Sequence, residues 1–488
     1  MMKFDFKKEL PGILFLFFIY FTARSQQTLT LEQSIQFAKE NSPSAKNAIQ
    51  SYKTRKFNYK SFTADYLPQL SLSGSIPGLD RAINPITQPS GTISYLPQSN
   101  LNTSGNLTIS QKIPFSGATF YVSSGISRTD IFGTYNTFYW LASPVQISLS
   151  QPIFQFNPMQ WDRDIQALQD LSYDRQFVEE MEDVSADVVQ KFFDLYLAQM
   201  NVANAEFNVS INDTLYQLSK GRFNLGKIAE NDLLQTELGL LNVKNDLESA
   251  RLDYQNAREN FKIALGYDIT NEINIKPNLD FLIINVDPDF AYEQAMKNRS
   301  DILNYQISEL QADRSLNQAE RNNSFNALLS ASYGLNQSAG NLPEAYKNLL
   351  DQERFNLSFS IPLFQWGKGT AQIESALSEK DRIKVSIENQ KKLFLQDVKY
   401  QTQKFLLLQK QVALSAKADT IATRRFEVAK NRYLIGKIDL NTFFIAQNEK
   451  NTALNTFIST LRNYWAALYR LRRITLYDFI KKEPLIKQ

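Results

Sequence analysis

The sequence predicts a mainly α-helical protein with a membrane β-barrel, built from two tandem structural repeats of helix, strands and a long coiled-coil helical hairpin. Three observations support this fold class. The chain matches itself at a constant shift, several short segments alternate apolar with small polar residues, and long segments without proline have helical periodicity. The repeat is considered first, because a missed repeat leads to the wrong architecture.

Two pairs of segments establish the repeat. One constant shift sets 148–156 (SLSQPIFQF) on 358–366 (SFSIPLFQW) and 222–228 (RFNLGKI) on 432–438 (RYLIGKI). Matches in separated places without an intervening gap indicate a duplication.

The duplication divides the chain into a first repeat over 26–277 and a second repeat over 278–488. The front of each repeat matches more weakly and at a larger shift. The first repeat must therefore contain an insertion between Ser73 and Leu149.

Each repeat is predicted to open with a helix, over 31–65 in the first repeat and 288–322 in the second. Thr30 can cap the first of these helices, and Pro68 ends it. Each repeat then closes with a helical hairpin, over 158–265 and 368–475. Apolar residues recur in these hairpins at the three- and four-residue spacing of a coiled coil.

Gly226 and Gly436 interrupt the hairpins near their middles and mark the two turns. At 1.5 Å per residue, each predicted arm is roughly 75 to 100 Å long. Such arms are far longer than the typical helix of a globular domain. The hairpins must therefore project from the rest of the protein.

The segments 69–151 and 327–361 contain the predicted strands. Their alternation suits an ordinary antiparallel sheet with one wet face, and it equally suits a barrel with an apolar outside and a polar lumen. Aromatic residues just past the strand-ending prolines favour the barrel, because a membrane barrel carries aromatic girdles at the interfaces. These membrane-interface aromatics are Phe154, Phe156, Phe364 and Trp366.

The first residues have the pattern of a signal peptide over 1–25. Lys3, Lys7 and Lys8 precede a short apolar run at 13–21, and small residues follow at a cleavage-like spacing. We expect the mature chain to begin near Gln26. The alternative is an uncleaved anchor, for which the apolar run is short.

Composition excludes several classes of function. The chain has no Cys and no His, so a thiolate nucleophile, an imidazole base and a Cys/His zinc site are all absent. Its formal net charge of +3 gives no case for nucleic-acid binding. We predict no enzyme activity, no metal and no cofactor. The acidic run at 179–183 is predicted to be a solvated helix face.

With these elements in place, the chain resembles the TolC family of outer-membrane efflux proteins over essentially its whole mature length. The most specific motifs are the hairpin turns, RFNLG at 222–226 and RYLIG at 432–436, and the strand ends QPIF at 151–154 and IPLF at 361–364. The resemblance implies a homotrimeric α-barrel/β-barrel in the outer membrane and its lipid. Each protomer would give four strands to a shared twelve-stranded barrel and four long helix segments to a periplasmic tunnel.

The insertion departs from the simplest family pattern and leaves two alternatives. It either forms an extracellular hairpin with surface loops, or it adds two strands per protomer and widens the barrel. We favour the first, because the second repeat has only two strands and the family has twelve in its barrel.

The resemblance also implies partners: a periplasmic adaptor, the membrane fusion protein, and an inner-membrane transporter. The hairpin tips would contact the adaptor. The tip positions that match the family are Arg222, Asn224, Leu225, Gly226, Lys227 and Ile228 in the first hairpin, and Arg432, Leu434, Ile435, Gly436, Lys437 and Ile438 in the second.

A periplasmic gate is implied in the same way. Tyr433 falls on a gating tyrosine of the family, although it could equally pack inside the coiled coil. The aspartate rings of the best-known member are replaced here by Thr442 and Ile445. Asp232 and Asp439 lie near the tips and could supply carboxylates instead. An apolar constriction around Phe444 and Ile445 is the other possibility.

The predicted function is therefore a passive trans-periplasmic conduit for export, in a tripartite efflux pump or a type I secretion system. The alternative is a periplasmic coiled-coil adaptor or scaffold without a pore. An adaptor usually carries one helical hairpin, whereas this chain carries two.

Overall fold

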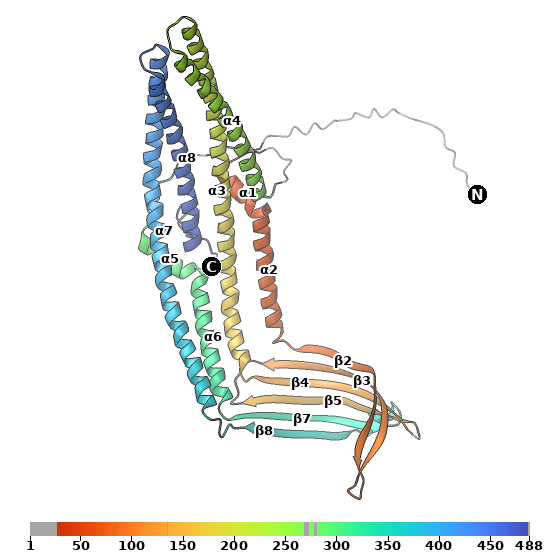
Figure 1. The fold of residues 1–488 in the computed structure, drawn as a ribbon. Helices are drawn as coiled ribbons and strands as arrows, with labels where there is room; N and C mark the ends of the chain where they lie inside the picture. Colours follow the sequence, from red (N-terminus) through yellow and green to blue (C-terminus); the bar gives the residue numbers. More distant parts are fainter. Residues whose placement is uncertain (1–26, 134, 268–272, 278–280, 487–488) are drawn as a thin grey trace, which may run out of the picture.

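The computed structural model describes residues 27–133, 135–267, 273–277 and 281–486. The predicted signal peptide lies outside these residues. A sheet occupies one end of the molecule, and two helical hairpins extend from it to the opposite end (Figure 1).

Two very long helices define the length of the molecule. α3 (Pro158–Asn224) and α7 (Lys368–Leu434) have 67 residues each, which corresponds to about 100 Å at 1.5 Å per residue. α4 (Glu230–Leu265) folds back along α3, and α8 (Leu440–Thr475) folds back along α7. Because α8 also contacts α3, the two hairpins lie side by side (Figure 1).

Each opening helix is divided into two. In the first repeat α1 (Leu31–Asn41) ends and α2 (Pro43–Ala64) begins at Ser42, whose ψ of 149° is outside the helical region. Pro43 explains the break, because the residue before a proline avoids the helical conformation. In the second repeat α5 (Pro288–Asn298) and α6 (Ser300–Asn322) are separated in the same way at Arg299. α2 and α6 then run beside α3 toward the sheet.

The main hydrophobic core lies midway along the helices. Short strands β1 (Gln27–Leu29) and β6 (Ile273–Ile275) pair in parallel there. The fully buried rings of Phe192, Phe261 and Tyr464 belong to this core. Strands β9 (Tyr477–Asp478) and β10 (Glu483–Pro484) form a small hairpin after α8. The core therefore joins both repeats and the C-terminal segment at one level.

Six strands make up the large sheet, in the order β2-β3-β4-β5-β7-β8, and each strand is antiparallel to its neighbours. The first repeat contributes the first four strands and the second repeat the last two; the short helix η1 (Glu344–Tyr346) lies between β7 and β8. The strands are β2 (Gln69–Thr87), β3 (Ile93–Ile113), β4 (Ala118–Phe132), β5 (Thr137–Ile153), β7 (Asn326–Ala339) and β8 (Leu350–Ser360).

This strand count corrects the sequence-based expectation. We favoured four strands per protomer with the insertion as an extracellular hairpin, but the insertion adds two strands to the sheet. The turn between β3 and β4 lies at the helical end, where Asn157 Nδ2 donates to the carbonyl of Pro114 at 2.7 Å. Only the far part of the insertion behaves as a hairpin. Residues 82–98 pair within β2 and β3 beyond the last residue of β4, and they protrude from the sheet (Figure 1).

Candidate functional site

The large sheet has one apolar and one polar face. In β5, Ile147 is paired with Val122 and Tyr333, whereas the neighbouring Ser148 is paired with Tyr121 and Ser332. The same alternation runs through the other strands. The apolar face includes Leu70, Leu72, Leu107, Ile109, Val122, Ile147, Leu149, Leu329, Leu335, Phe355, Leu357 and Phe359. The polar face includes Ser71, Ser73, Asn106, Thr108, Ser110, Ser148, Ser150, Ser330, Ser332, Asn356 and Ser358.

The apolar face is uncovered in the single chain. Leu72, Phe355 and Phe359 are 79%, 73% and 71% exposed. A contiguous apolar surface of this kind is unusual on a protein that stays in water, and it marks an interaction or membrane surface. Across the described ranges, no helix combines the length and the apolar character that crossing a membrane requires.

Three of the four proposed interface aromatics are exposed where the sheet meets the helices. Phe154, Phe364 and Trp366 are 61%, 72% and 88% exposed. Phe364 and Trp366 contact each other, with ring centroids 4.6 Å apart. Phe154 and Trp366 have positive φ values of 60° and 51°, which bulky residues adopt only when the surroundings enforce them. Phe156 differs, because it is half-buried below the guanidinium of Arg314.

The two hairpin tips have the same backbone geometry. Gly226 and Gly436 have φ values of 68° and 73°, in the left-handed region that favours glycine. The amide of Lys227 donates to the carbonyl of Arg222 at 2.9 Å, and Lys437 donates to Arg432 at the same distance. These are Schellman bonds, which satisfy the last carbonyls of α3 and α7.

This geometry leaves most of each tip in contact with solvent. Leu225 is 71% exposed and Ile435 is 66% exposed. Asn224, Gly226 and Lys227 are also exposed in the first tip, as are Arg432, Leu434, Gly436 and Lys437 in the second. Arg222, Ile228 and Ile438 are half-buried. The tips therefore present apolar and cationic side chains without a partner from their own hairpin turn.

Tyr433 does not reach the surface of the single chain. It is 6% exposed, and its ring centroid lies 5.6 Å from that of Phe443. Together with Leu215 and Phe426 these residues form a small core, here called the tip cluster, which joins α3 to the second hairpin. Tyr433 therefore packs between the hairpins, whereas its counterpart Phe223 is 37% exposed.

A lysine extends the tip cluster toward the sheet. Lys450 Nζ lies 4.5 Å from the ring centroid of Phe207 and 5.0 Å from that of Phe426. Burial lowers the pKa of Lys450 despite the opposing effect of Glu427 and Asp419. Aromatic faces stabilise a cation that has lost part of its hydration. The contact therefore adds a polar link between the two hairpins.

The remaining gate candidates divide by role. Asp439 caps α8, since its Oδ1 accepts from the amide of Thr442 at 2.6 Å, and hydrogen bonds from Thr442 and Asn441 lower the pKa of this carboxyl. Asp232 lies exposed in the first turn of α4. Phe444 is half-buried against the tip cluster, and Ile445 is 45% exposed. Thus Asp232 and Ile445 are available to a neighbouring chain, whereas Asp439 is engaged in capping.

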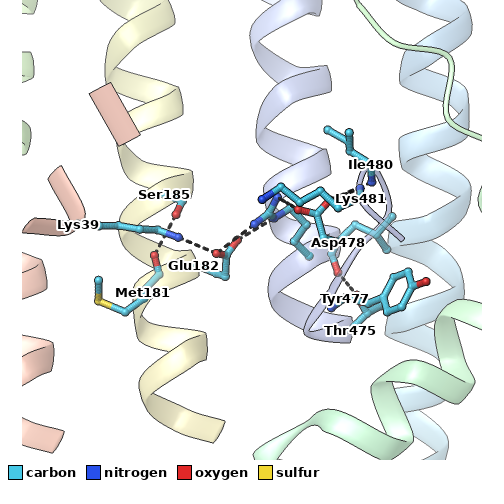
Figure 2. Close-up of polar contacts among 11 residues, drawn as sticks. Lys39, Met181, Glu182, Ser185, Thr475, Tyr477, Asp478, Ile480 and Lys481 are labelled. Atoms are coloured by element: carbon cyan, nitrogen blue, oxygen red, sulfur yellow. Dashed lines mark hydrogen bonds and ion pairs between the residues drawn. The ribbon is translucent and has the colours of Figure 1, made fainter. Parts of the chain in front are cut away.

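A buried ion-pair cluster was missed by the sequence analysis. The carboxylate of Glu182 accepts from Lys39 Nζ at 2.8 Å and from Arg472 Nε at 3.0 Å, and Arg472 also pairs with Asp478 at 2.7 Å (Figure 2). The Glu182 side chain is only 3% exposed. Burial lowers the pKa of Arg472, but the carboxylates of Glu182 and Asp478 outweigh that effect and raise it. The cluster links α1, α3, α8 and the C-terminal hairpin.

Glu179 makes a second buried link one turn away. Its Oε1 accepts from the amide of Ser300 at 3.0 Å, and its Oε2 lies 3.3 Å from Arg299. Glu179 therefore caps α6 from a different repeat. The prediction that the acidic run is a solvated face is wrong for Glu179 and Glu182, since cations distant in the sequence surround them. The basic run at 470–473 was a sequence signal for a partner of the acidic run.

The described part of the chain contains no group of acidic side chains arranged to hold a metal. The functional features are instead surfaces: a two-faced sheet, a helical body and two exposed tips. Such a set suits a structural conduit.

Comparison with known proteins decides the family. The model of the outer membrane efflux protein family matches residues 119–267 and 291–475, which is more than half of the chain. The chain belongs to this family. The CmeC outer membrane channel of Campylobacter jejuni has a similar structure, with a TM-score of 0.66, 17% identity, and coverage of 94% of this chain and 87% of that one.

Two further structures of the outer membrane are similar. The outer membrane protein VceC of Vibrio cholerae has a TM-score of 0.64 at 13% identity, covering 91% of this chain and 95% of its own. The MtrE outer membrane channel of Neisseria gonorrhoeae, in its open state, has a TM-score of 0.63 at 15% identity, covering 92% and 89%. No curated protein matches the chain significantly.

These comparisons confirm the predicted fold class, the outer-membrane location and the channel class of function. The efflux protein family consists of channels rather than enzymes, and nothing in it favours a scaffold without a pore. The surfaces described above are therefore surfaces of an outer-membrane efflux channel.

We predict that Glu182→Gln destabilises the protein far more than Glu180→Gln. Glu182→Gln removes the buried negative charge between Lys39 and Arg472, and a broken buried pair costs about 3–5 kcal/mol. Glu180 belongs to the same helix but makes a partly exposed pair with Arg55, for which about 0–1 kcal/mol is expected. Thermal melting of the detergent-solubilised protein measures the difference. Equal melting temperatures for the two variants would contradict a stabilising role of the cluster.

Proposed function

We propose that three copies of this chain form a passive export channel, with the sheets closing a pore through the outer membrane and the helices forming a periplasmic tunnel. The observation that carries the proposal is the direct continuation of a two-faced sheet into helices about 100 Å long. An open sheet in lipid leaves unpaired backbone groups at both edges, which the bilayer does not tolerate. Cyclic association of identical copies removes these edges.

The channel is proposed to supply the path and no energy. With neither His nor Cys in the chain, it has few of the groups that catalysis commonly uses. The energy for export would come from an inner-membrane transporter, connected through a periplasmic adaptor. The exposed tips support this connection, because each offers an apolar residue beside a cation.

The gate is proposed to lie near the same tips. Asp232 and Ile445, both exposed in the single chain, would face neighbouring copies there. Tyr433 would act indirectly, since its packing in the tip cluster fixes how the second hairpin lies against α3. Opening would then move one hairpin relative to the other.

The experiment for the proposal combines location, oligomeric state and conductance. Membranes are separated, the protein is solubilised in mild detergent, and boiled and unboiled samples are compared by gel mobility. An outer-membrane species of three protomers that conducts ions in planar bilayers is expected. A monomer in the soluble periplasmic fraction would overturn the proposal.

The two-faced sheet gives a sharper prediction. Ile147→Arg places a charge on the apolar face, where an arginine at the bilayer midplane costs about 2–4 kcal/mol. Ser148→Arg places the same charge on the polar face of the same strand. We expect Ile147→Arg to reduce the amount of assembled trimer in the outer membrane severely, and Ser148→Arg to assemble normally. If Ser148→Arg blocked assembly and Ile147→Arg did not, the polar face would be the one in contact with lipid, and the proposed orientation of the sheet would be wrong.

Charge reversal at the tips tests the adaptor contact. Lys227→Glu combined with Lys437→Glu is expected to abolish export in cells, because the adaptor surface would meet carboxylates instead of ammonium groups. Trimer assembly and bilayer conductance should stay unchanged. The matched control is Lys244→Glu with Lys417→Glu, which reverses two exposed lysines further along the arms. Intracellular accumulation of a fluorescent dye or another exported compound gives the readout. Equal export by both double variants would show that the tip lysines do not take part in the adaptor contact.

A further inference from the structure

All six strands of the large sheet have the character of a barrel wall, including the two that the insertion adds. In β3, Leu107 and Ile109 share the apolar face with Leu72 and Leu70, to which they are paired. On the other side of β3, Ile109 is paired with Val122 of β4. The residues between them alternate onto the polar face. A surface hairpin has no need for this pattern, whereas a strand with lipid on one side and water on the other requires it.

The inserted strands also match the rest of the sheet in position. At the helical end, Ile113 is paired with Ala118 at the turn between β3 and β4, close to the last residues of β5. There Gln151 Nε2 donates to the carbonyl of Ser116 at 2.9 Å. At the helical end the two inserted strands are therefore level with their neighbours.

The two free edges of the sheet are complementary. β2 is one edge and β8 is the other, and among the described strands neither has an outer neighbour. β2 runs away from α2 at the helical end, whereas β8 returns toward α7. The edges are thus antiparallel to each other when two copies stand side by side, which continues the pattern of the whole sheet.

We propose that β2 of one copy pairs with β8 of the next, so that the trimer encloses a barrel of eighteen strands. The inference rests on the proposed trimer, and it departs from the twelve strands that the family resemblance implies. Its consequence is a wide aqueous lumen through the outer membrane, since barrels of sixteen to eighteen strands leave a water-filled channel.

Simple geometry supports a wall of this size. With strands about 4.8 Å apart and tilted about 40°, eighteen strands give a circumference of about 113 Å, whereas twelve give about 75 Å. Each copy also contributes four helical columns: α3, α7, α2 followed by α4, and α6 followed by α8 (Figure 1). Twelve columns spaced about 8–10 Å apart have a circumference of about 96–120 Å. Six strands per copy therefore match the width of the helices that they join.

The similar widths of the strand barrel and the helical tunnel bear on where the channel is narrowest. A barrel about as wide as the tunnel would not narrow the path in the membrane, so we place the narrowest point at the gate proposed near the hairpin tips. Cargo size would then be limited by the tips alone. The outer-membrane segment would admit molecules about one and a half times as wide as a twelve-stranded wall does, because barrel diameter grows roughly linearly with strand number.

Disulfide cross-linking tests the β2–β8 seam, since the chain has no native cysteine. Ser71→Cys in β2 is combined in turn with Asn356→Cys, Ser358→Cys and Ser360→Cys in β8, which together cover the unknown register on the polar face. The control replaces Ser71→Cys with Thr119→Cys in β4. In a twelve-stranded wall made of β4, β5, β7 and β8, β4 would be the edge that meets β8.

We expect cross-linked dimers and trimers from at least one Ser71 pair and none from the Thr119 pairs. Cross-links from Thr119 without any from Ser71 would establish the smaller wall and overturn the inference. If the heat-resistant trimer forms but gives no cross-links at all, the proposed pairing of β2 with β8 is also wrong. Failure of the trimer itself to form is a separate result, which counts against the proposed function.

Charge substitution in β3 is an independent check. If β3 is part of the wall, Leu107→Arg should reduce trimer assembly as strongly as Ile147→Arg, and Thr108→Arg should assemble normally. The measurement is the amount of heat-resistant trimer in the outer-membrane fraction. Normal assembly of both β3 variants would mean that β3 lies outside the lipid and would contradict the eighteen-stranded barrel.

Discussion

The backbone of a strand in lipid must find all its hydrogen-bond partners within the protein, and the rest of this structure depends on that requirement. Four of the six strands of the large sheet are paired on both sides, and β2 and β8 are paired on one side. The unpaired edges make a lone copy unsuited to the membrane. In the proposed trimer the same edges pair with those of neighbouring copies, and this pairing closes the pore. In that assembly, association and channel function have one physical origin.

The helices must also keep their relative positions, and buried charges contribute to this. Glu182 and Glu179 each connect α3 to elements from elsewhere in the chain, through Lys39, Arg472 and Arg299. At the same level of the molecule, the end of α4 packs closely against the end of α1. A side chain in place of Gly266 would meet the carbonyl of Asn41 at 2.4 Å. A buried ion pair is specific in direction and partner, in contrast to apolar contact. The middle of the molecule thus combines the main hydrophobic core with buried ion pairs, while the tips have only the smaller tip cluster.

Local signals predicted most of the fold, and long-range contacts account for what was missed. The glycines of the two tips and the prolines at the strand ends act within a few residues, so the turn positions and the long helices followed from the sequence. The pairing of Glu182 with Arg472 joins residues far apart, and no local pattern indicates which cations reach an acidic run. The inserted strands were visible as alternation at 107–110, but the family pattern of four strands outweighed that signal.

The two hairpin tips show how duplication can yield unequal parts. Their turns share the same left-handed glycine and the same Schellman bond, because both features are set by a short motif. Their side chains differ: Tyr433 is buried against Phe443, whereas Phe223 at the matching position is partly exposed. The second tip is therefore packed against α3 of the first hairpin through Tyr433, whereas Phe223 makes no matching buried contact in the first tip. In the proposed gate, the tip cluster would be the contact that changes when one hairpin moves relative to the other.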